Sequence, residues 1–409
     1  MSTLGWLGAA AMIILCTRMV GGILHRLRVP FVVGELLGGL VLGVLASGSV
    51  GGLAWFAITS DVQRTIDDVA EVAVVILMLE VGYDIRNKTR HVLGSQHLAK
   101  FAAGSLLIPS FAGLCVALLT PTMVLPPDGR SSAYILLCSA VFAVTALPIL
   151  ALLLVDMGIM DTLEARLALS AAAVSDVAAW LFVGIAVALQ ASSSIAQALS
   201  LVAILGAAGA FTTWLRPLLL AAGRLEQIRS SVSVLLGLVL LSAGVAHLGG
   251  AHPAIVSLIV GASIADPTGR LRPAVDAAAR GNLLILMPFF VVQLGFSFDV
   301  GIFASPWIVL GALFACVVSL VSKVAGGLVG SVGVNSIPTM VVIRAGVLGS
   351  SKGLTELLVL STAMQTGIIG PVLYSVGVAM TIVNTVLVAP LLGVLLRYER
   401  RAATMLLTR

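Results

Sequence analysis

Asp176 is the residue whose type and position point most directly to chemistry. It occurs in Ala171-Ala-Ala-Val-Ser-Asp-Val-Ala-Ala-Trp180, halfway along an apolar run at 164–189. A charge at bilayer depth costs about 2.5–3.5 kcal/mol on insertion scales, so a charge kept there is a candidate functional group. Desolvation favours the protonated acid, whereas a bound monovalent cation favours the carboxylate. One such group can hold a proton or a cation in turn, which is the minimum requirement for ion exchange.

Other polar side chains in apolar runs are candidates to assist this acid. Thr145 and the carbonyls freed near Pro148 could supply the oxygen ligands that hard cations prefer. Ser175 precedes the acid, and we place it in the same cation- and proton-binding set. Lys323 and Lys352 are candidates for charge compensation. The secondary candidates are Glu356 and Glu35.

Each candidate has a structural alternative. Asp176 could be a buried acid that a serine or lysine satisfies, and Thr145 could be a helix-packing hydroxyl. The two lysines could neutralise helix-end dipoles without binding a substrate. Glu35 lies among glycines that favour close helix packing, and a structural role suits it better than ligand binding.

The composition sets the class of protein in which these residues act. The 409 residues are 59% hydrophobic and 10% charged, against roughly 25% charged in soluble domains. Too few polar side chains are available to cover a soluble core, which excludes secreted disulfide scaffolds, nucleic-acid binders and almost every soluble enzyme class. The four cysteines lie in apolar runs without metal-binding spacing. We therefore expect an all-α polytopic membrane protein that is no enzyme, with no cofactor and no metal beyond a transported cation.

Apolar runs of about 18 or more residues mark the expected membrane spans. About thirteen transmembrane helices are predicted, which leaves one integral membrane domain over 1–409 and no room for a soluble C-terminal domain. The spans are 5–23, 31–49, 67–84, 97–119, 132–154, 164–189, 196–221, 231–248, 252–266, 281–297, 305–331, 337–365 and 369–396.

The distribution of Lys and Arg predicts the orientation of these spans. With the N-terminus outside and the C-terminus inside, 18 of the 23 basic residues fall on the inner side, as the positive-inside rule favours. This explains the net charge of +5 without a nucleic-acid partner.

Two spans carry helix-breaking residues at matching positions. Pro148 interrupts the fifth span, and Gly349-Ser-Ser-Lys-Gly353 interrupts the twelfth. Each broken helix is the fourth of five spans in a repeat, over about 31–189 and 252–396. The repeats have opposite topology, and such paired interruptions are typical of inverted-repeat transporters with a midplane site.

Several segments, in this order along the chain, resemble those of the cation:proton antiporter-2 family. They are Arg28-Val-Pro-Phe-Val-Val-Gly-Glu35, Thr145-Ala-Leu-Pro-Ile-Leu150, Leu169–Trp180, Pro288–Gly295, Ser322-Lys323 with Gly326, and Ser351–Leu360. The resemblance implies a sodium/proton antiporter-like fold and a homodimer in the lipid bilayer, here expected in a bacterial plasma membrane. It implies that the two broken helices cross, with Thr145 at the crossover. It also implies elevator-like exchange of H⁺ for Na⁺ or K⁺, with Asp176 as the binding acid and Lys323 near the acid.

The sequence departs from the family pattern at two points. Ser175 stands where the family usually has Asn or Asp, and a single acid favours electroneutral one-for-one exchange. Lys352 stands where related proteins often have Arg, which keeps the charge but loses the planar fork. The chain also lacks the nucleotide-binding domain of gated potassium-efflux systems, so we expect no gating by that route.

Two other transport functions remain as alternatives. One is a potassium-efflux pathway or channel-like pore, although no filter motif such as TVGYG occurs. The other is an exporter of an organic or ion-complexed metabolite on the same scaffold, which the unusual Ser175 leaves open.

Overall fold

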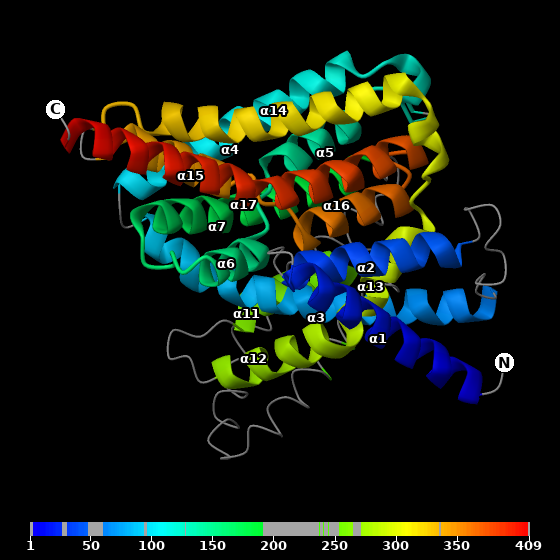
Figure 1. Ribbon diagram of the computed structural model, residues 1–409. Coiled ribbons are helices and arrows are strands. Elements are labelled where there is room, and N and C mark those ends of the chain that lie inside the picture. Colours follow the sequence, from blue (N-terminus) through cyan, green and yellow to red (C-terminus); the bar gives the residue numbers. More distant parts are fainter. Residues whose placement is uncertain are drawn as a thin grey trace. The chain divides into compact units, whose positions relative to one another are not determined.

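The computed structural model describes 3–26, 31–47, 60–93, 96–126, 128–190, 253–264, 271–334 and 337–407, together with the isolated residues 237, 240 and 244. All regular structure within these ranges is helical (Figure 1). A five-residue π-helical segment, Asn282–Leu286, joins α12 to α13. The helices are α1 (Thr3–Arg26), α2 (Phe31–Ala46), α3 (Ser60–Leu93), α4 (Gln96–Leu119), α5 (Ser132–Ala143), α6 (Leu147–Asp156), α7 (Leu163–Gln190), α11 (Pro253–Ile264), α12 (Arg272–Gly281), α13 (Met287–Phe296), α14 (Pro306–Gly330), α15 (Thr339–Leu348), α16 (Leu354–Gln365) and α17 (Pro371–Leu407).

The helices confirm the prediction of an all-α polytopic membrane protein. Within the described ranges, six helices are long and apolar enough to cross a membrane, and each overlaps an expected span, although the helix over Arg272–Phe296 begins nine residues before the expected 281–297. They are Trp6–Arg26, Gln96–Leu119, Leu163–Gln190, Arg272–Phe296, Pro306–Gly330 and Pro371–Tyr398. Two further expected spans lie outside the described residues: 196–221 entirely, and 231–248 apart from the isolated residues 237, 240 and 244.

The chain divides into two compact units. Unit 1 comprises Met1–Arg18, Gly39–His91 and Ala188–Phe296. Unit 2 comprises Met19–Gly38, Val92–Val187 and Ser297–Arg409. All the predicted site residues belong to unit 2.

Unit 1 is held together by apolar packing and by polar side chains that bond to buried backbone carbonyls. Ser257 of α11 donates to the Val75 carbonyl of α3 at 2.6 Å. Asn282 donates to the Ala73 carbonyl at 2.9 Å, beside the π-helical segment. In a membrane interior such polar side chains pair with backbone groups because water is absent.

In unit 2, small residues on α7 bring α6, α15 and α17 into one apolar cluster. The alanines allow close helix approach, and the leucines and valines fill the remaining space. Its buried members are Leu150, Leu153, Leu154, Ala165, Ala168, Ala172, Val347, Leu348, Val388 and Leu392.

The first predicted helix break is confirmed in unit 2. α5 ends at Ala143, and both Val144 and Ala146 are extended before α6 begins at Leu147. Pro148 lies in the first turn of α6, where its missing N–H needs no helical partner. The break therefore precedes the proline instead of forming a kink at it.

The second predicted break is confirmed in the same unit. α15 ends at Leu348 and α16 begins at Leu354, so the expected span 337–365 is two half-helices. Gly353 precedes α16, and a Cβ atom there would lie 2.0 Å from Ile149 Cδ1 of α6. A larger residue at this position would require the Ile149 side chain to move.

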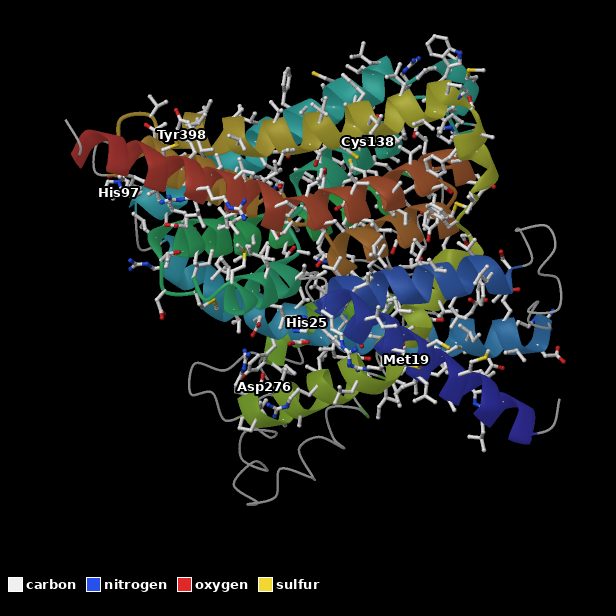
Figure 2. The ribbon with its side chains drawn as sticks, viewed as in Figure 1. Met19, His25, His97, Cys138, Asp276 and Tyr398 are labelled. Atoms are coloured by element: carbon white, nitrogen blue, oxygen red, sulfur yellow. The ribbon has the colours of Figure 1, made fainter. Side chains whose placement is uncertain are left out.

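Close backbone contacts pack α4 against its neighbours in unit 2. A Cβ atom on Gly104 would lie 2.2 Å from the Gly326 carbonyl oxygen of α14. Gly113 of α4 similarly lies against the backbone of Cys138 on α5, where the thiol is labelled in Figure 2. These contacts hold α5 and α14, which carry parts of the candidate site, against one helix.

Replacing Gly104 with alanine tests this packing. The added methyl group forces α4 and α14 apart, and overpacking of this kind costs about 1–3 kcal/mol. We expect a melting temperature lower by several degrees in detergent. Gly184→Ala on α7 is the matched control, because its Cβ atom would meet nothing within 4 Å. Equal melting temperatures for the two variants would contradict the close contact.

Candidate functional site

The two broken helices pair their free backbone groups with each other. The Ala146 amide donates to the Ser351 carbonyl at 3.1 Å. The Thr145 hydroxyl donates to the Gly349 carbonyl at 2.6 Å. Figure 1 shows the half-helices α5, α6, α15 and α16 within unit 2, together with α4, α14 and α17. The expected crossing of two broken helices is thus present.

Lys323 reaches this crossing from the middle of α14. Its side chain is 1% exposed, and its ammonium donates to the Thr145 hydroxyl at 2.8 Å and to the Ala143 carbonyl. Ala143 is the last residue of α5, so the positive charge lies at the negative end of a helix dipole. This contact agrees with a role for Lys323 in compensating the partial negative charge of the carbonyl groups at the break.

Lys352 lies within the second break and contacts the same helix end. Its ammonium donates to the Val141 carbonyl at 2.5 Å and lies 3.3 Å from Glu356 Oε1. Both side chains are 0% exposed. Glu356 is in the first turn of α16, where a helix N-terminus stabilises a carboxylate.

Asp176 lies in the middle of α7 and is 4% exposed. Its carboxylate interacts electrostatically with the Lys323 ammonium, which also interacts with Lys352 and Glu356. The buried charged groups described around the crossing include two acids, Asp176 and Glu356, and two lysines, Lys323 and Lys352, whose formal charges balance. Adding one proton or one monovalent cation to Asp176 changes this balance by the same amount.

The hydroxyl groups expected to bind a cation have other bonds in the structure. Thr145 donates its proton to Gly349 and accepts one from Lys323, which leaves one lone pair on its oxygen. Ser175 donates to the Ala172 carbonyl of its own helix at 3.0 Å. Cation binding by these two residues remains a prediction, whereas the position of Thr145 at the crossing is observed.

Glu35 has a different setting, although it too belongs to unit 2. It is half-buried on α2, and a Cβ atom on Gly21 of α1 would lie 2.8 Å from its Cγ atom. Gly34 approaches the same glycine closely. This setting agrees with the structural role that the glycine pattern favours.

Two contacts near the crossing were not anticipated from the sequence. The Thr385 hydroxyl of α17 lies 3.0 Å from the Lys352 amide nitrogen and 2.7 Å from the Lys352 carbonyl oxygen. Arg344 of α15 lies 3.3 Å from Glu164 of α7, which pairs two charges that α15 and α7 carry in apolar surroundings. A charged residue such as Arg344 within an expected span indicates a buried partner. Thr385 gives no such indication, because threonine is common in apolar helices.

The described residues contain no cluster of three or more His, Cys, Asp or Glu side chains suited to a resident metal ion. Cys16, Cys115, Cys138 and Cys316 are free thiols. Buried carboxyl groups with positive charges nearby lie around the crossing, and such groups are able to take up and release protons or monovalent cations.

Comparison with solved structures agrees with this architecture. The sodium proton antiporter MjNhaP1 from Methanocaldococcus jannaschii matches with a TM-score of 0.63 and 15% identity, over 96% of each chain. At this identity the likeness shows the fold, which is that of a sodium/proton antiporter.

Sequence relatives are cation/proton antiporters of several organisms. Cation/H(+) antiporter 17 of Arabidopsis thaliana is 26% identical over 93% of this chain and 47% of its own length. Na(+)/H(+) antiporter NhaS4 of Synechocystis is 24% identical, over 91% of this chain and 93% of its own. K(+)/H(+) antiporter 1 of Saccharomyces cerevisiae is 21% identical over 93% of this chain and 45% of its own length. The chain thus spans about half the length of the plant and yeast relatives.

The family described as sodium/hydrogen exchanger, transmembrane, matches residues 11–397, which include both broken helices and every candidate site residue. This chain therefore belongs to the transmembrane sodium/hydrogen exchanger family.

Proposed function

We propose that this protein is a secondary antiporter that exchanges H⁺ for Na⁺ or K⁺, with Asp176 binding the two ions in turn. Its family consists of transporters, not enzymes. The observation that carries the proposal is the almost fully buried Asp176 carboxylate on α7, which interacts with the lysine bound to the crossing. A carboxylate held beside fixed positive charge releases one cation readily when another takes its place.

The ions proposed here follow from the relatives and from the site chemistry. Relatives named as Na⁺/H⁺ and K⁺/H⁺ antiporters both align with the chain. Carboxylate and hydroxyl oxygens suit either alkali cation. Thr145 and Ser175 are proposed as further oxygen ligands, while Lys323 and Lys352 are proposed as compensating charges.

We also propose that exchange is electroneutral. Ser175 offers no second carboxylate next to Asp176. If Asp176 carries one proton in one direction and one monovalent cation in the other, no net charge crosses the membrane. Asp176, the crossing and both lysines belong to unit 2, which suits an elevator-like movement of this unit within a homodimer. The proposed orientation has the N-terminus outside and the C-terminus inside.

Replacing Asp176 with asparagine tests the proposed ion site. Proteoliposomes with a pH gradient and an internal pH-sensitive dye report proton movement when Na⁺, K⁺ or Li⁺ is added. We expect Na⁺ or K⁺ to dissipate the gradient with the native protein, and at least 100-fold slower exchange with Asp176→Asn because asparagine neither ionises nor releases a proton.

Asp161→Asn is the matched control, since Asp161 is exposed in the turn before α7. We expect this variant to exchange as the native protein does. Native-like exchange by Asp176→Asn would contradict the proposal, as would a native protein that exchanges no monovalent cation. Dissipation by an organic solute alone would favour the metabolite exporter, and dissipation without cation dependence would favour a pore.

Competition at one carboxyl group predicts the pH dependence. Protonation of Asp176 removes the cation site, so the apparent KM for Na⁺ or K⁺ should rise as the pH falls. One proton displaced per cation gives an increase of up to about tenfold per pH unit on the acid side. Initial exchange rates measured between pH 5.5 and 8.5 test this, and a pH-independent KM would contradict direct competition.

An imposed membrane potential tests the stoichiometry. A gradient of the permeant anion thiocyanate, in liposomes loaded for Na⁺/H⁺ or K⁺/H⁺ exchange, sets the potential independently of the transported ions. We expect the initial rate to change by less than about twofold over 100 mV, because one-for-one exchange moves no net charge. A rate that rises steeply with potential would show that net charge crosses the membrane in each cycle.

A further inference from the structure

Thr385 is a polar residue of α17 that lies at the second break of the crossing. Its side chain is buried, and its hydroxyl oxygen accepts a hydrogen bond from the Lys352 amide at 3.0 Å. The same oxygen lies 2.7 Å from the Lys352 carbonyl and 2.8 Å from the Thr381 carbonyl one turn earlier on α17. A single hydroxyl from another helix thus contacts both backbone groups of Lys352.

Several other backbone groups of this break have partners within the two broken helices. The Gly349 and Ser351 carbonyls accept from Thr145 and Ala146 of the first break. The Ser350 and Ser351 amides donate to α15, whose carbonyls lie at 3.1 Å. For Lys352, the partner that the structure provides is Thr385.

The position of the Lys352 backbone determines where its charge lies. The Lys352 ammonium is held between the Val141 carbonyl of α5 and the carboxylate of Glu356. α17 supports the lysine of this ion pair, because the Thr385 hydroxyl accepts a hydrogen bond from the Lys352 backbone amide. A shift of the backbone at the break would move the ammonium away from the helix end that it compensates.

We propose that Thr385 is a positioning residue of the ion site: it holds the Lys352 backbone and thereby fixes the Lys352 ammonium against α5 during exchange. This inference rests on the proposed antiport function and extends it to α17. A threonine suits the position because one hydroxyl both accepts from an amide and donates to a carbonyl. Valine has nearly the same shape but offers neither bond, whereas serine offers both.

Removing this hydroxyl has a defined cost in a membrane. Water is scarce there, so an amide and a carbonyl left without partners either recruit water or move to new ones. Leaving a buried donor or acceptor unpaired costs about 1–3 kcal/mol, which is more than the net gain from an average hydrogen bond. When the Thr385 hydroxyl is removed, we therefore expect the backbone around Lys352 to rearrange while the rest of the protein remains folded.

Hydrogen–deuterium exchange of the full-length protein in lipid nanodiscs tests the backbone contact directly. In Thr385→Val, a peptide covering 349–357 should contain an amide that exchanges at least tenfold faster than in the native protein. Thr385→Ser should stay within about twofold of native. Thr17→Val is the matched control, since the buried Thr17 hydroxyl bonds to the Ile13 carbonyl of its own helix.

Exchange assays on the same variants test the functional part. The maximal rate of cation/proton exchange should fall at least tenfold in Thr385→Val, equivalent to about 1.4 kcal/mol. Serine should restore the rate to within about twofold of native, and Thr17→Val should leave it unchanged. A residue needed only for folding would instead lower the amount of monodisperse protein without slowing the rate per folded molecule.

Three results would overturn the inference: unchanged amide exchange at 349–357 in Thr385→Val, a serine variant as impaired as the valine variant, or faster amide exchange with a native transport rate. A native protein that exchanges no cation would contradict the proposed function instead. The amide measurement still tests the contact in that case, so the two failures are distinguishable.

Discussion

Every backbone amide and carbonyl inside a bilayer must find a partner within the protein, and the two broken helices depend on this constraint. A continuous helix satisfies its own groups, but the breaks after Ala143 and Leu348 release several of them. The structure pairs the breaks with each other through Thr145 and Ala146, and it completes the pairing with side chains of α14 and α17. The two breaks are tolerated inside the membrane because each supplies hydrogen-bond partners to the other.

The same constraint brings charge to the site. The carbonyls at the end of α5 that lack helical partners attract the ammonium groups of Lys323 and Lys352. Isolated charges are costly in this region. These positive charges in turn make it less costly to keep Asp176 and Glu356 ionised. In this account the ion-binding acid is a consequence of how the broken helices are stabilised, because the lysines that satisfy the carbonyls also face the acids.

The sequence alone predicts the membrane class, the positions of both breaks and the acid. Pro148 and the Gly-Ser-Ser-Lys-Gly segment are strong local signals, and Asp176 is visible because charges are rare in this chain. The contacts of Thr385 and the Arg344–Glu164 pair could not be predicted in this way, since they join helices distant in sequence. A threonine in an apolar helix usually bonds to a backbone carbonyl of the same helix, as Thr17 does. The sequence around such a threonine gives no sign of a tertiary partner. Likewise, the sequence indicates oxygen ligands at Thr145 but not that Lys323 and Gly349 already bond to this hydroxyl.

The central claim is that one carboxyl group, that of Asp176, holds either a proton or a monovalent cation. Proton release on cation binding tests it most directly, with purified protein in weakly buffered detergent and a pH-indicator dye. Saturating Na⁺ or K⁺ should release up to one proton per chain, approaching one at the acid end of the pH range where binding still occurs, and Asp176→Asn should release none. Cation binding without proton release, or equal release from the asparagine variant, would contradict the account.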